Sequence, residues 1–405
     1  MPYLPFTLPI LFLYPLVSGT ENELYRVSAV IVLGFIALFA ATRSNLRQVV
    51  TRQPWILLVF GLVIVMIFSS LLSENKAQAI IGIPGDFQGL LLQLSSIIIG
   101  YYAASKMTIK NFWRVAAYAS GLVCMLSTLF DIPTVLHGYR LSGLLFHATG
   151  IALYAAVALS LNVTVGAERK RNRFTVWSDL FRWASIIAAV STLVLSASRI
   201  GLIAAVASLL LIAVFKPARR QLSLTVAVLC VGLVLVGGNL IKSVNRVSDA
   251  GRVETGVSYR LQLYQWSISL SSPSLLGVGA SQVDTVLQPR DEVATPVPIQ
   301  KTLNEGFAFW YSHCQFIDMY IQYGVAGLLL FGGLIGWALV NTSKLYGQAL
   351  RKRQEIGDGT LCASVCLIVV LLHLLVNTPS VELYPLVFFA IFAGFTIKRP
   401  VQGLS

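Results

Sequence analysis

Long apolar segments alternate with short polar ones along the 405 residues of the chain. Each segment approaches the ~20 residues that an α-helix needs to cross a bilayer. Backbone groups in lipid must pair within the chain, and the alternating pattern of a membrane barrel does not recur, so the segments predict helices. About twelve spans of this length are expected, at residues 4–20, 24–42, 54–72, 88–105, 112–130, 143–166, 176–196, 200–215, 222–241, 315–343, 360–378 and 381–397. The first segment lacks a basic start and a small-residue cleavage site, which favours a retained span over a signal peptide.

Basic residues concentrate in alternate connectors between these segments. They are Arg43, Arg47, Arg52, Lys106, Lys110, Arg114, Arg169, Lys170, Arg171, Arg173, Lys216, Arg219, Arg220, Lys344, Arg351, Lys352, Arg353, Lys398 and Arg399. The positive-inside rule places these connectors and both termini in the cytoplasm. Charged residues make up only 12% of the chain and hydrophobic residues 56%. The net charge of +13 is therefore mainly a topology signal, which predicts membrane lipids and not nucleic acid as partners.

The outward-facing connectors are short except for the one over residues 242–312, and a structureless loop of about 70 residues is rare. Val257–Leu270 has helical spacing, with Leu261, Tyr264 and Ile268 on one face. Leu287–Gln300 is rich in proline and is expected to be irregular. We therefore predict a partly helical outer cap at 242–312, between transmembrane parts at 1–241 and 313–405.

Several basic residues lie in outward connectors, against the general charge pattern. Arg199 follows Ser196-Ala197-Ser198 in a sharp turn between two spans. It is either an interfacial anchor that extends toward water or a phosphate ligand, since a guanidinium fork suits a diphosphate better than an ammonium does. Arg260 lies on the expected cap helix and is either an exposed arginine or a second diphosphate ligand. It lies beside Tyr259, Tyr264 and Trp266, whose rings would lie on lipid or stack on sugar. Arg246 is a further, weaker candidate for substrate binding.

His313 stands where the long loop meets the next apolar segment. A neutral imidazole suits a base that accepts a proton from a sugar hydroxyl near neutral pH, although a polar residue at a helix end also has purely structural uses. Asp318 and Glu305 flank it and are candidates to orient it. His147 begins another span on the same side. Cys314 adjoins His313, but consecutive helical residues point about 100° apart, which disfavours a Cys–His nucleophilic pair.

Some motifs of metal and nucleotide sites are missing. The chain has no D-x-D pair, no H-E-x-x-H and no P-loop lysine motif. We therefore expect no metal and no cofactor. A glycosyl-transfer site without a metal would need cations to neutralise the leaving diphosphate, and the outward arginines are candidates for that role.

The chain resembles the O-antigen ligase and polymerase superfamily of bacterial envelope enzymes, in its topology and in four motifs in order. Arg140 to His147 (RLSGLLFH) is similar to the glycine–histidine segment, and Ser196 to Gly201 (SASRIG) to the serine–arginine turn. Arg260, Trp266, Pro273 and the glycines of Gly277-Val278-Gly279 are similar to the loop signature. The segment Ser312 to Leu328 looks like the histidine motif, where Cys314 replaces a usual asparagine.

The resemblance implies an all-α polytopic membrane protein of GT-C type with a large periplasmic loop. It also implies a metal-independent inverting glycosyltransferase of the bacterial inner membrane that acts at the periplasmic face. The donor would be a glycan on undecaprenyl diphosphate, and the acceptor of a ligase would be lipid A–core. His313, Arg199 and Arg260 are the expected catalytic residues. Arg140, His147, Tyr259, Tyr264, Trp266 and Arg246 are the expected substrate-binding residues.

Other functions stay open at this point. A polymerase of the same superfamily would use a lipid-linked O-unit as acceptor. A transporter of lipid-linked sugars predicts charges near helix midpoints and a path to both faces, whereas the cationic residues here gather on one side. A cell-wall polymerase of the shape-and-division family would need its own acidic site in the large loop.

Overall fold

The structure, a computed structural model, describes most of the chain from residue 55 onward. The described residues are 31–32, 34–35, 38, 55–82, 89–105, 112–136, 141, 148–165, 173–216, 219–245, 257–271, 274–290, 293–304, 309, 311–352, 356–376 and 384–396. Within these ranges every regular element is an α-helix. The first two expected spans lie almost entirely outside them.

Ten of the helices lie where spans were expected. They are α5 (Trp55–Leu72), α7 (Leu90–Ser105), α8 (Phe112–Leu136), α9 (Ala148–Thr164), α10 (Arg173–Leu195), α11 (Arg199–Phe215), α12 (Arg220–Asn245), α16 (Gln315–Lys352), α17 (Asp358–Leu374) and α18 (Tyr384–Thr396). Among the described residues, stretches of α5, α8, α10 and α16 are long and apolar enough to cross a membrane, and the others are shorter apolar helices. The described part of the protein is thus all-helical, and its apolar helices indicate a multi-pass membrane protein.

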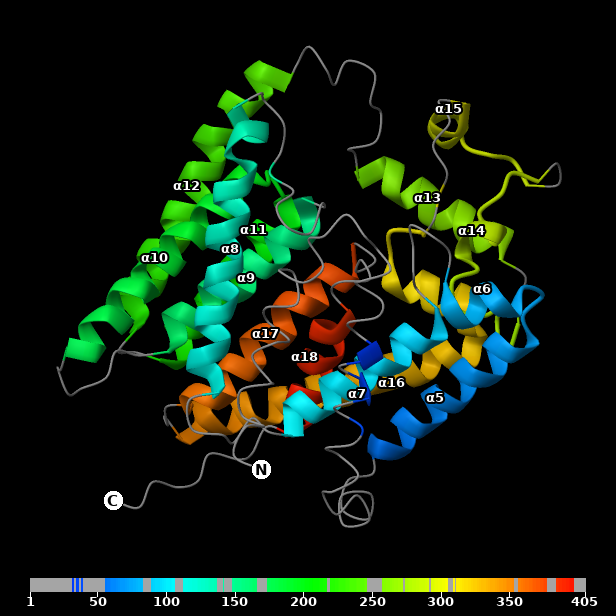
Figure 1. Cartoon of the computed structure of the whole chain (residues 1–405), viewed down its shortest axis with the longest axis horizontal. Helices are drawn as coiled ribbons and strands as arrows, with labels where there is room; N and C mark the ends of the chain where they lie inside the picture. The colour runs from blue at the N-terminus through cyan, green and yellow to red at the C-terminus, as the bar shows by residue number, and fades with distance from the viewer. Residues whose placement is uncertain are drawn as a thin grey trace.

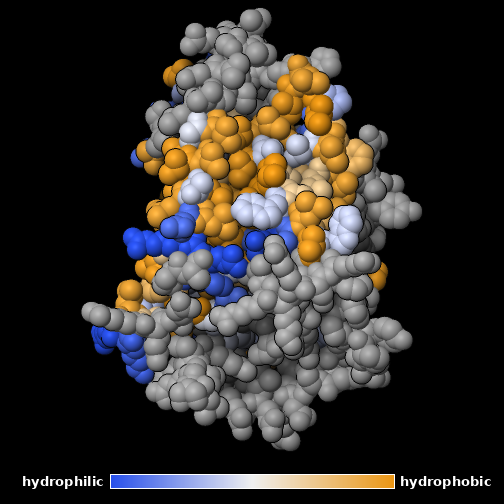
Figure 2. All heavy atoms as spheres, turned by 90° about the vertical axis from the view of Figure 1, so that its left-hand side faces the viewer, coloured by the Kyte–Doolittle hydropathy of each residue, from blue (hydrophilic) through white to orange (hydrophobic). Residues whose placement is uncertain are grey.

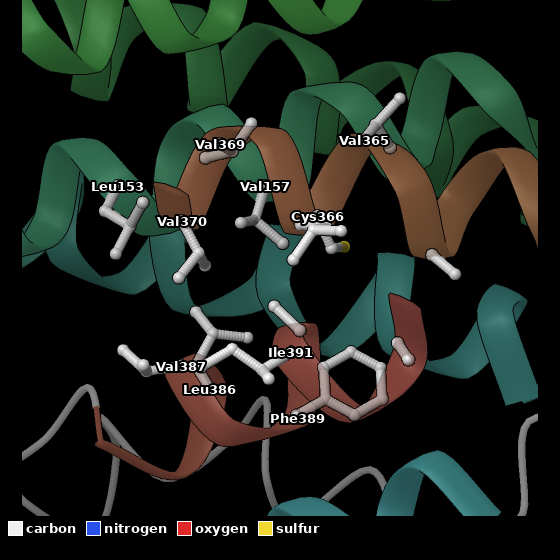
Figure 3. Packing of buried hydrophobic residues seen from close by; sticks show 14 of the residues in the cluster. Leu153, Val157, Val365, Cys366, Val369, Val370, Leu386, Val387, Phe389 and Ile391 are labelled. Atoms are coloured by element: carbon white, nitrogen blue, oxygen red, sulfur yellow. The ribbon is translucent and has the colours of Figure 1, made fainter. Parts of the chain in front are cut away.

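Helix α9 forms the centre of the bundle and packs against α8, α10, α11 and α17. Its residues from Gly150 to Thr164 are all buried. Small side chains permit this close approach: a Cβ added at Gly201 of α11 would lie 2.6 Å from the Cβ of Ala152. Figure 3 shows the adjoining layer, where Val370 and Cys366 of α17 and Val157 of α9 lie toward Leu386, Val387 and Ile391 of α18. Packing of this kind holds helices together in lipid, where hydrophobic burial alone gives little.

The lateral surface of the bundle, along the lengths of the helices, is apolar. Trp177 and Ile187 of α10 and Val228 of α12 are more than half exposed. Figure 2 shows this side of the molecule, with a broad apolar face above a band of hydrophilic residues. Exposed apolar area of this extent is unfavourable in water and suits contact with lipid chains.

Helix α17 connects the two ends of the bundle. At its start, Asp358 pairs with Lys216 at the end of α11, and the Lys216 ammonium also donates to the Thr164 carbonyl at 2.9 Å. Just beyond its other end, the Val376 carbonyl accepts a hydrogen bond from Arg260 of the cap. The basic connectors around Lys216 and the cap therefore lie at opposite ends of α17, as the charge pattern predicts.

The described residues of the cap form the helices α13 (Val257–Leu270), α14 (Val283–Val286) and α15 (Val297–Asn304). Figure 1 shows them together at one side of the molecule, near the start of α16 and the short helix α6 (Lys76–Ile81). The expected helix at Val257–Leu270 is confirmed in both bounds. The expectation of irregular chain over Leu287–Gln300 is wrong at its end, because α15 begins there with Pro298 in its first turn, where a missing N–H does no harm.

Helix α16 is broken at Gly324, which corrects the expectation of one continuous span over 315–343. Gly324 has φ 66° and ψ −165°, a conformation nearly exclusive to glycine. The break frees backbone groups, and the chain between Ser274 and Gly279 bonds to them. The four hydrogen bonds are Val278 N to Ile321 O at 3.0 Å, Gly279 N to Gln322 O at 2.9 Å, Val325 N to Ser274 O at 3.0 Å and Ala326 N to Leu275 O at 3.2 Å. Non-helical backbone at membrane depth is tolerated because protein satisfies it in this way.

Buried polar side chains surround the break. The Ser69 hydroxyl of α5 donates to the Gln322 carbonyl at 2.6 Å. The Tyr323 hydroxyl donates to Gln93 Oε1 of α7 at 2.5 Å, and the Gln93 amide donates to Gln322 Oε1 at 3.2 Å. The network fixes the start of α16, and with it the loop that carries His313, against α5 and α7.

Candidate functional site

The loop before α16 carries His313 in a strained backbone conformation. Its φ is 61°, in the left-handed region that residues other than glycine seldom adopt. Strain of this kind persists only where the surroundings impose it, and it is frequent at functional sites. The side chain is partly buried, and its ring meets the ring of Tyr311 edge to face at 4.7 Å between centroids.

Hydrogen bonds hold the backbone on both sides of His313. The Ser312 N–H donates to Asp318 Oδ1 at 2.8 Å. The Cys314 N–H donates to the Ser312 hydroxyl at 3.2 Å, and this hydroxyl donates to the Cys314 carbonyl at 3.0 Å. Ser312 and Asp318 are fully buried. Asp318 lies in the first turn of α16, where the helix dipole favours a negative charge.

Tyr264 of the cap helix α13 connects this loop to Arg260. Its hydroxyl donates to the His313 carbonyl at 3.1 Å, and the Arg260 guanidinium, one turn earlier on the same helix, lies close enough to interact electrostatically with the phenol. Arg260 in turn donates through Nη1 to the carbonyl of Val376, beyond the end of α17. A cation at a helix C-terminus is electrostatically favourable. The structure thus brings together two of the expected catalytic residues, Arg260 and His313, with Tyr264 between them.

The protonation of Tyr264 follows from its position. Burial raises the pKa of its phenol, as do the nearby Cys314 and Asp318, and the contact with Arg260 lowers it by less. The hydroxyl therefore keeps its proton at neutral pH and remains a hydrogen-bond donor. Burial likewise raises the pKa of the Cys314 thiol, which keeps it in the weakly nucleophilic neutral form.

Tyr259 and Trp266 lie on the opposite face of α13 and pack inside the cap. Tyr259 is 6% exposed, and its hydroxyl lies 3.3 Å from the Thr302 hydroxyl of α15. Trp266 is 2% exposed and meets Phe309 edge to face. In contrast, Leu261 and Ile268, which were expected to share a face with Tyr264, are more than half exposed. The buried rings hold α13 in place, and of the three aromatics named as substrate ligands only Tyr264 reaches the His313 loop.

Arg199 begins α11 and is exposed. The Ser198 hydroxyl caps this helix by accepting from the Gly201 N–H at 3.3 Å, and Ala197 before it has a left-handed φ of 49°. The turn before it also meets the glycine–histidine segment, because the buried Leu141 donates through its N–H to the Leu195 carbonyl at 3.0 Å. Arg199 thus lies at a helix N-terminus, a position that favours anions, outside the chain of contacts from Arg260 to His313.

Other expected residues fall outside the described part of the chain. These are Arg140, His147, Arg246 and Glu305. Within the described part, no three His, Cys, Asp or Glu side chains come together as a metal site would require.

The contact between the Gly277-Val278-Gly279 segment and the break in α16 could not be predicted from the sequence. Both segments contain glycines with positive φ, namely Gly277 at 70°, Gly279 at 105° and Gly324 at 66°. The glycines were visible in the sequence as turn signals, but their partners were not. The buried Gln93 and Gln322 gave a second signal, since amides are unfavourable in lipid unless another protein group binds them.

Comparison with known proteins gives one family. Residues 183–332 match the family model described as O-antigen ligase. The match begins in α10 and ends in α16 beyond its break, so it includes Arg199, Arg260, Tyr264 and His313. Comparison with curated proteins found no match.

Proposed function

We propose that this chain, which belongs to the O-antigen ligase family, catalyses the reaction of a ligase. The family match supports a glycosyl-transfer enzyme of the ligase or polymerase type. In the proposed reaction, the protein transfers a glycan from undecaprenyl diphosphate to a sugar hydroxyl of lipid A–core at the periplasmic face of the inner membrane. The reaction is metal-independent and inverts the anomeric centre.

The contact chain from Arg260 through Tyr264 to His313 is the observation that carries this proposal. It joins a residue suited to bind a diphosphate to one suited to accept a proton, and it lies at the end of the bundle opposite the basic connectors. A guanidinium has five N–H donors, so the bond to the Val376 carbonyl leaves donors for a substrate oxygen.

The mechanism follows from the chemistry of these groups. The donor lipid enters between helices, and its diphosphate stops at the outer leaflet. Arg260 and Arg199 neutralise the negative charge that grows on the diphosphate as the bond from its oxygen to the anomeric carbon breaks. The acceptor oxygen attacks the same carbon from the opposite side, and its proton passes to His313. The products are the glycosylated acceptor and undecaprenyl diphosphate.

Transfer by the purified full-length protein tests the proposal. The assay contains lipid-linked glycan, lipid A–core and a chelator of divalent metals, and the expected result is chelator-resistant transfer. His313→Ala should lower the rate by about 10²- to 10⁴-fold, the range for loss of a general base. Normal turnover by an intact His313→Ala protein would refute the base assignment, and transfer abolished by the chelator would refute metal independence.

The acceptor needs a test of its own. Lipopolysaccharide from a strain that lacks this gene is separated on a gel. A complete core without attached chains is the expected result for a ligase. Core with single O-units would instead identify a polymerase, and unchanged lipopolysaccharide with altered membrane distribution of lipid-linked sugar would identify a transporter.

A further inference from the structure

Three consecutive residues around His313 are fixed through their backbone atoms. Asp318 accepts from the N–H of Ser312, Tyr264 donates to the carbonyl of His313, and the Ser312 hydroxyl accepts from the N–H of Cys314. Two of the groups that do this belong to other elements, the first turn of α16 and the cap helix α13. The loop is therefore held at two adjacent residues, Ser312 from the first turn of α16 and His313 from the cap.

The conformation that these bonds maintain is unfavourable on its own. A histidine at φ 61° has a crowded Cβ, so the loop would relax toward negative φ if its partners were removed. Relaxation would rotate the Cα–Cβ bond and move the imidazole away from its contact with Tyr311. A shift of about 1 Å in a reacting group lowers a rate by about 10²-fold.

We infer that Tyr264 and Asp318 are positioning residues, which hold His313 in its left-handed conformation and so direct its imidazole at the acceptor hydroxyl. The inference rests on the proposed function of His313. Tyr264 acts through its O–H donor, and Asp318 acts through an acceptor oxygen on the Ser312 N–H. Neither needs contact with the substrate for this role.

The chemistry of each residue defines a conservative variant. Phenylalanine keeps the ring of Tyr264 and removes the donor. Asparagine at Asp318 keeps an oxygen acceptor for the Ser312 N–H and removes the charge, whereas alanine removes both. The positioning role therefore predicts that Asp318→Asn retains most of the function that Asp318→Ala loses.

The first test measures transfer by Tyr264→Phe in the full-length protein. We expect kcat to fall about 10- to 100-fold, the effect of a misplaced reacting group, with the KM for donor lipid unchanged. The matched control is Tyr118→Phe, which removes a partly buried hydroxyl bonded to Ser178 between α8 and α10. It should leave kcat and KM unchanged. In a His313→Ala background, Tyr264→Phe should lower the residual rate no further, because it acts through the imidazole.

The second test measures the environment of His313 in the loop independently of catalysis. Diethyl pyrocarbonate modifies neutral imidazoles, and peptide mass spectrometry gives the rate at His313, with the buried His373 as an internal reference. We expect Tyr264→Phe and Asp318→Ala to change the rate at His313 relative to wild type, while Asp318→Asn and Tyr118→Phe do not. An unchanged elution profile in size-exclusion chromatography confirms that each variant is folded.

The outcomes separate the two proposals. A wild-type protein without transfer would refute the proposed function, while the modification rates would still show whether Tyr264 and Asp318 fix His313. Active wild type together with full kcat and an unchanged modification rate in Tyr264→Phe would overturn the inference. So would equal losses in Asp318→Asn and Asp318→Ala, because the charge and not the acceptor oxygen would then matter.

Discussion

Gly277 and Gly324 lie backbone to backbone across the break in α16: a Cβ added at Gly277 would stand 2.6 Å from the Gly324 nitrogen. Residues 47 positions apart in the sequence thus share one contact. The chain after α13 satisfies the backbone that the break exposes, so the cap and the membrane helix support one another.

The first prediction concerns this contact. Gly277→Ala and Gly324→Ala should lower stability, because each adds a Cβ against backbone atoms at a positive φ, and strain of this kind costs about 1–3 kcal/mol. The measurement is the unfolding temperature of the purified protein in detergent. Gly336→Ala in the same helix is the control, since no atom lies within 4 Å of its added Cβ. Unfolding temperatures equal to that of Gly336→Ala would contradict the account of the break.

The second prediction separates a planar guanidinium from a point charge at Arg260. Arg260→Lys should lower transfer by at least about tenfold, because one ammonium cannot serve Val376, Tyr264 and a diphosphate in the geometry of a fork. The rate is measured with saturating acceptor. Arg290→Lys, an exposed change elsewhere in the cap, should leave the rate as it is. Full activity of Arg260→Lys would remove bidentate recognition from the mechanism.

The third prediction concerns Arg199. Because its side chain is exposed at the start of α11, its attraction for a diphosphate is screened by salt. Arg199→Ala should raise the KM for donor lipid, and its KM should change less with ionic strength than that of wild type. Arg351→Ala, an exposed change in the last turn of α16, is the control. An Arg199→Ala protein with the salt dependence of wild type would assign Arg199 the alternative role of an interfacial anchor.

The fourth prediction is a dependence of stability on pH. Burial raises the pKa of Asp284 above its ordinary value of 3.8, more than the hydrogen bonds from Thr285, its own backbone and Gln78 lower it. The folded protein then binds this proton more tightly than the unfolded chain does. The ionised carboxylate therefore destabilises the fold progressively as pH rises from 3.8 through the raised pKa.

Asp284→Asn should accordingly unfold at a higher temperature than wild type at pH 7, and the difference should shrink as pH falls toward 4. Asparagine keeps an oxygen that accepts from the Gln78 amide. Thermal unfolding from pH 4 to 7 gives the comparison, with the exposed Glu74→Gln as the control. A difference that is constant across this range would show that the charge of Asp284 is not its cause.

Most of the fold could be predicted from the sequence. Segment length and apolar composition gave ten helices at the places where they occur, and the helix over Val257–Leu270 was predicted in both bounds. These properties are local, because a span in lipid must form its own backbone hydrogen bonds whatever its neighbours are. The count of twelve spans and the likeness to GT-C enzymes stay predictions.

The candidate residues were also visible in the sequence, but their relationships were not. Arg260, Tyr264 and His313 were each named as separate candidates, and only the structure joins them. Tyr259 and Trp266 lie on the same helix as Arg260 and Tyr264, but their side chains are buried inside the cap. Which face of a short helix is buried depends on what packs against it, and residues 257–270 alone contain no such information.

The sequence by itself predicted where the apolar helices lie, which connectors between them are basic, and which polar residues stand outside these connectors. Hydropathy and charge act residue by residue against the membrane, so a linear pattern is enough to express them. The tertiary structure alone decided that α16 breaks at Gly324, that the segment from Ser274 to Gly279 fills the break, and that Tyr264 and Asp318 hold His313 at a positive φ. These features depend on hydrogen bonds between segments far apart in the chain, and such partners become defined only when the helices pack.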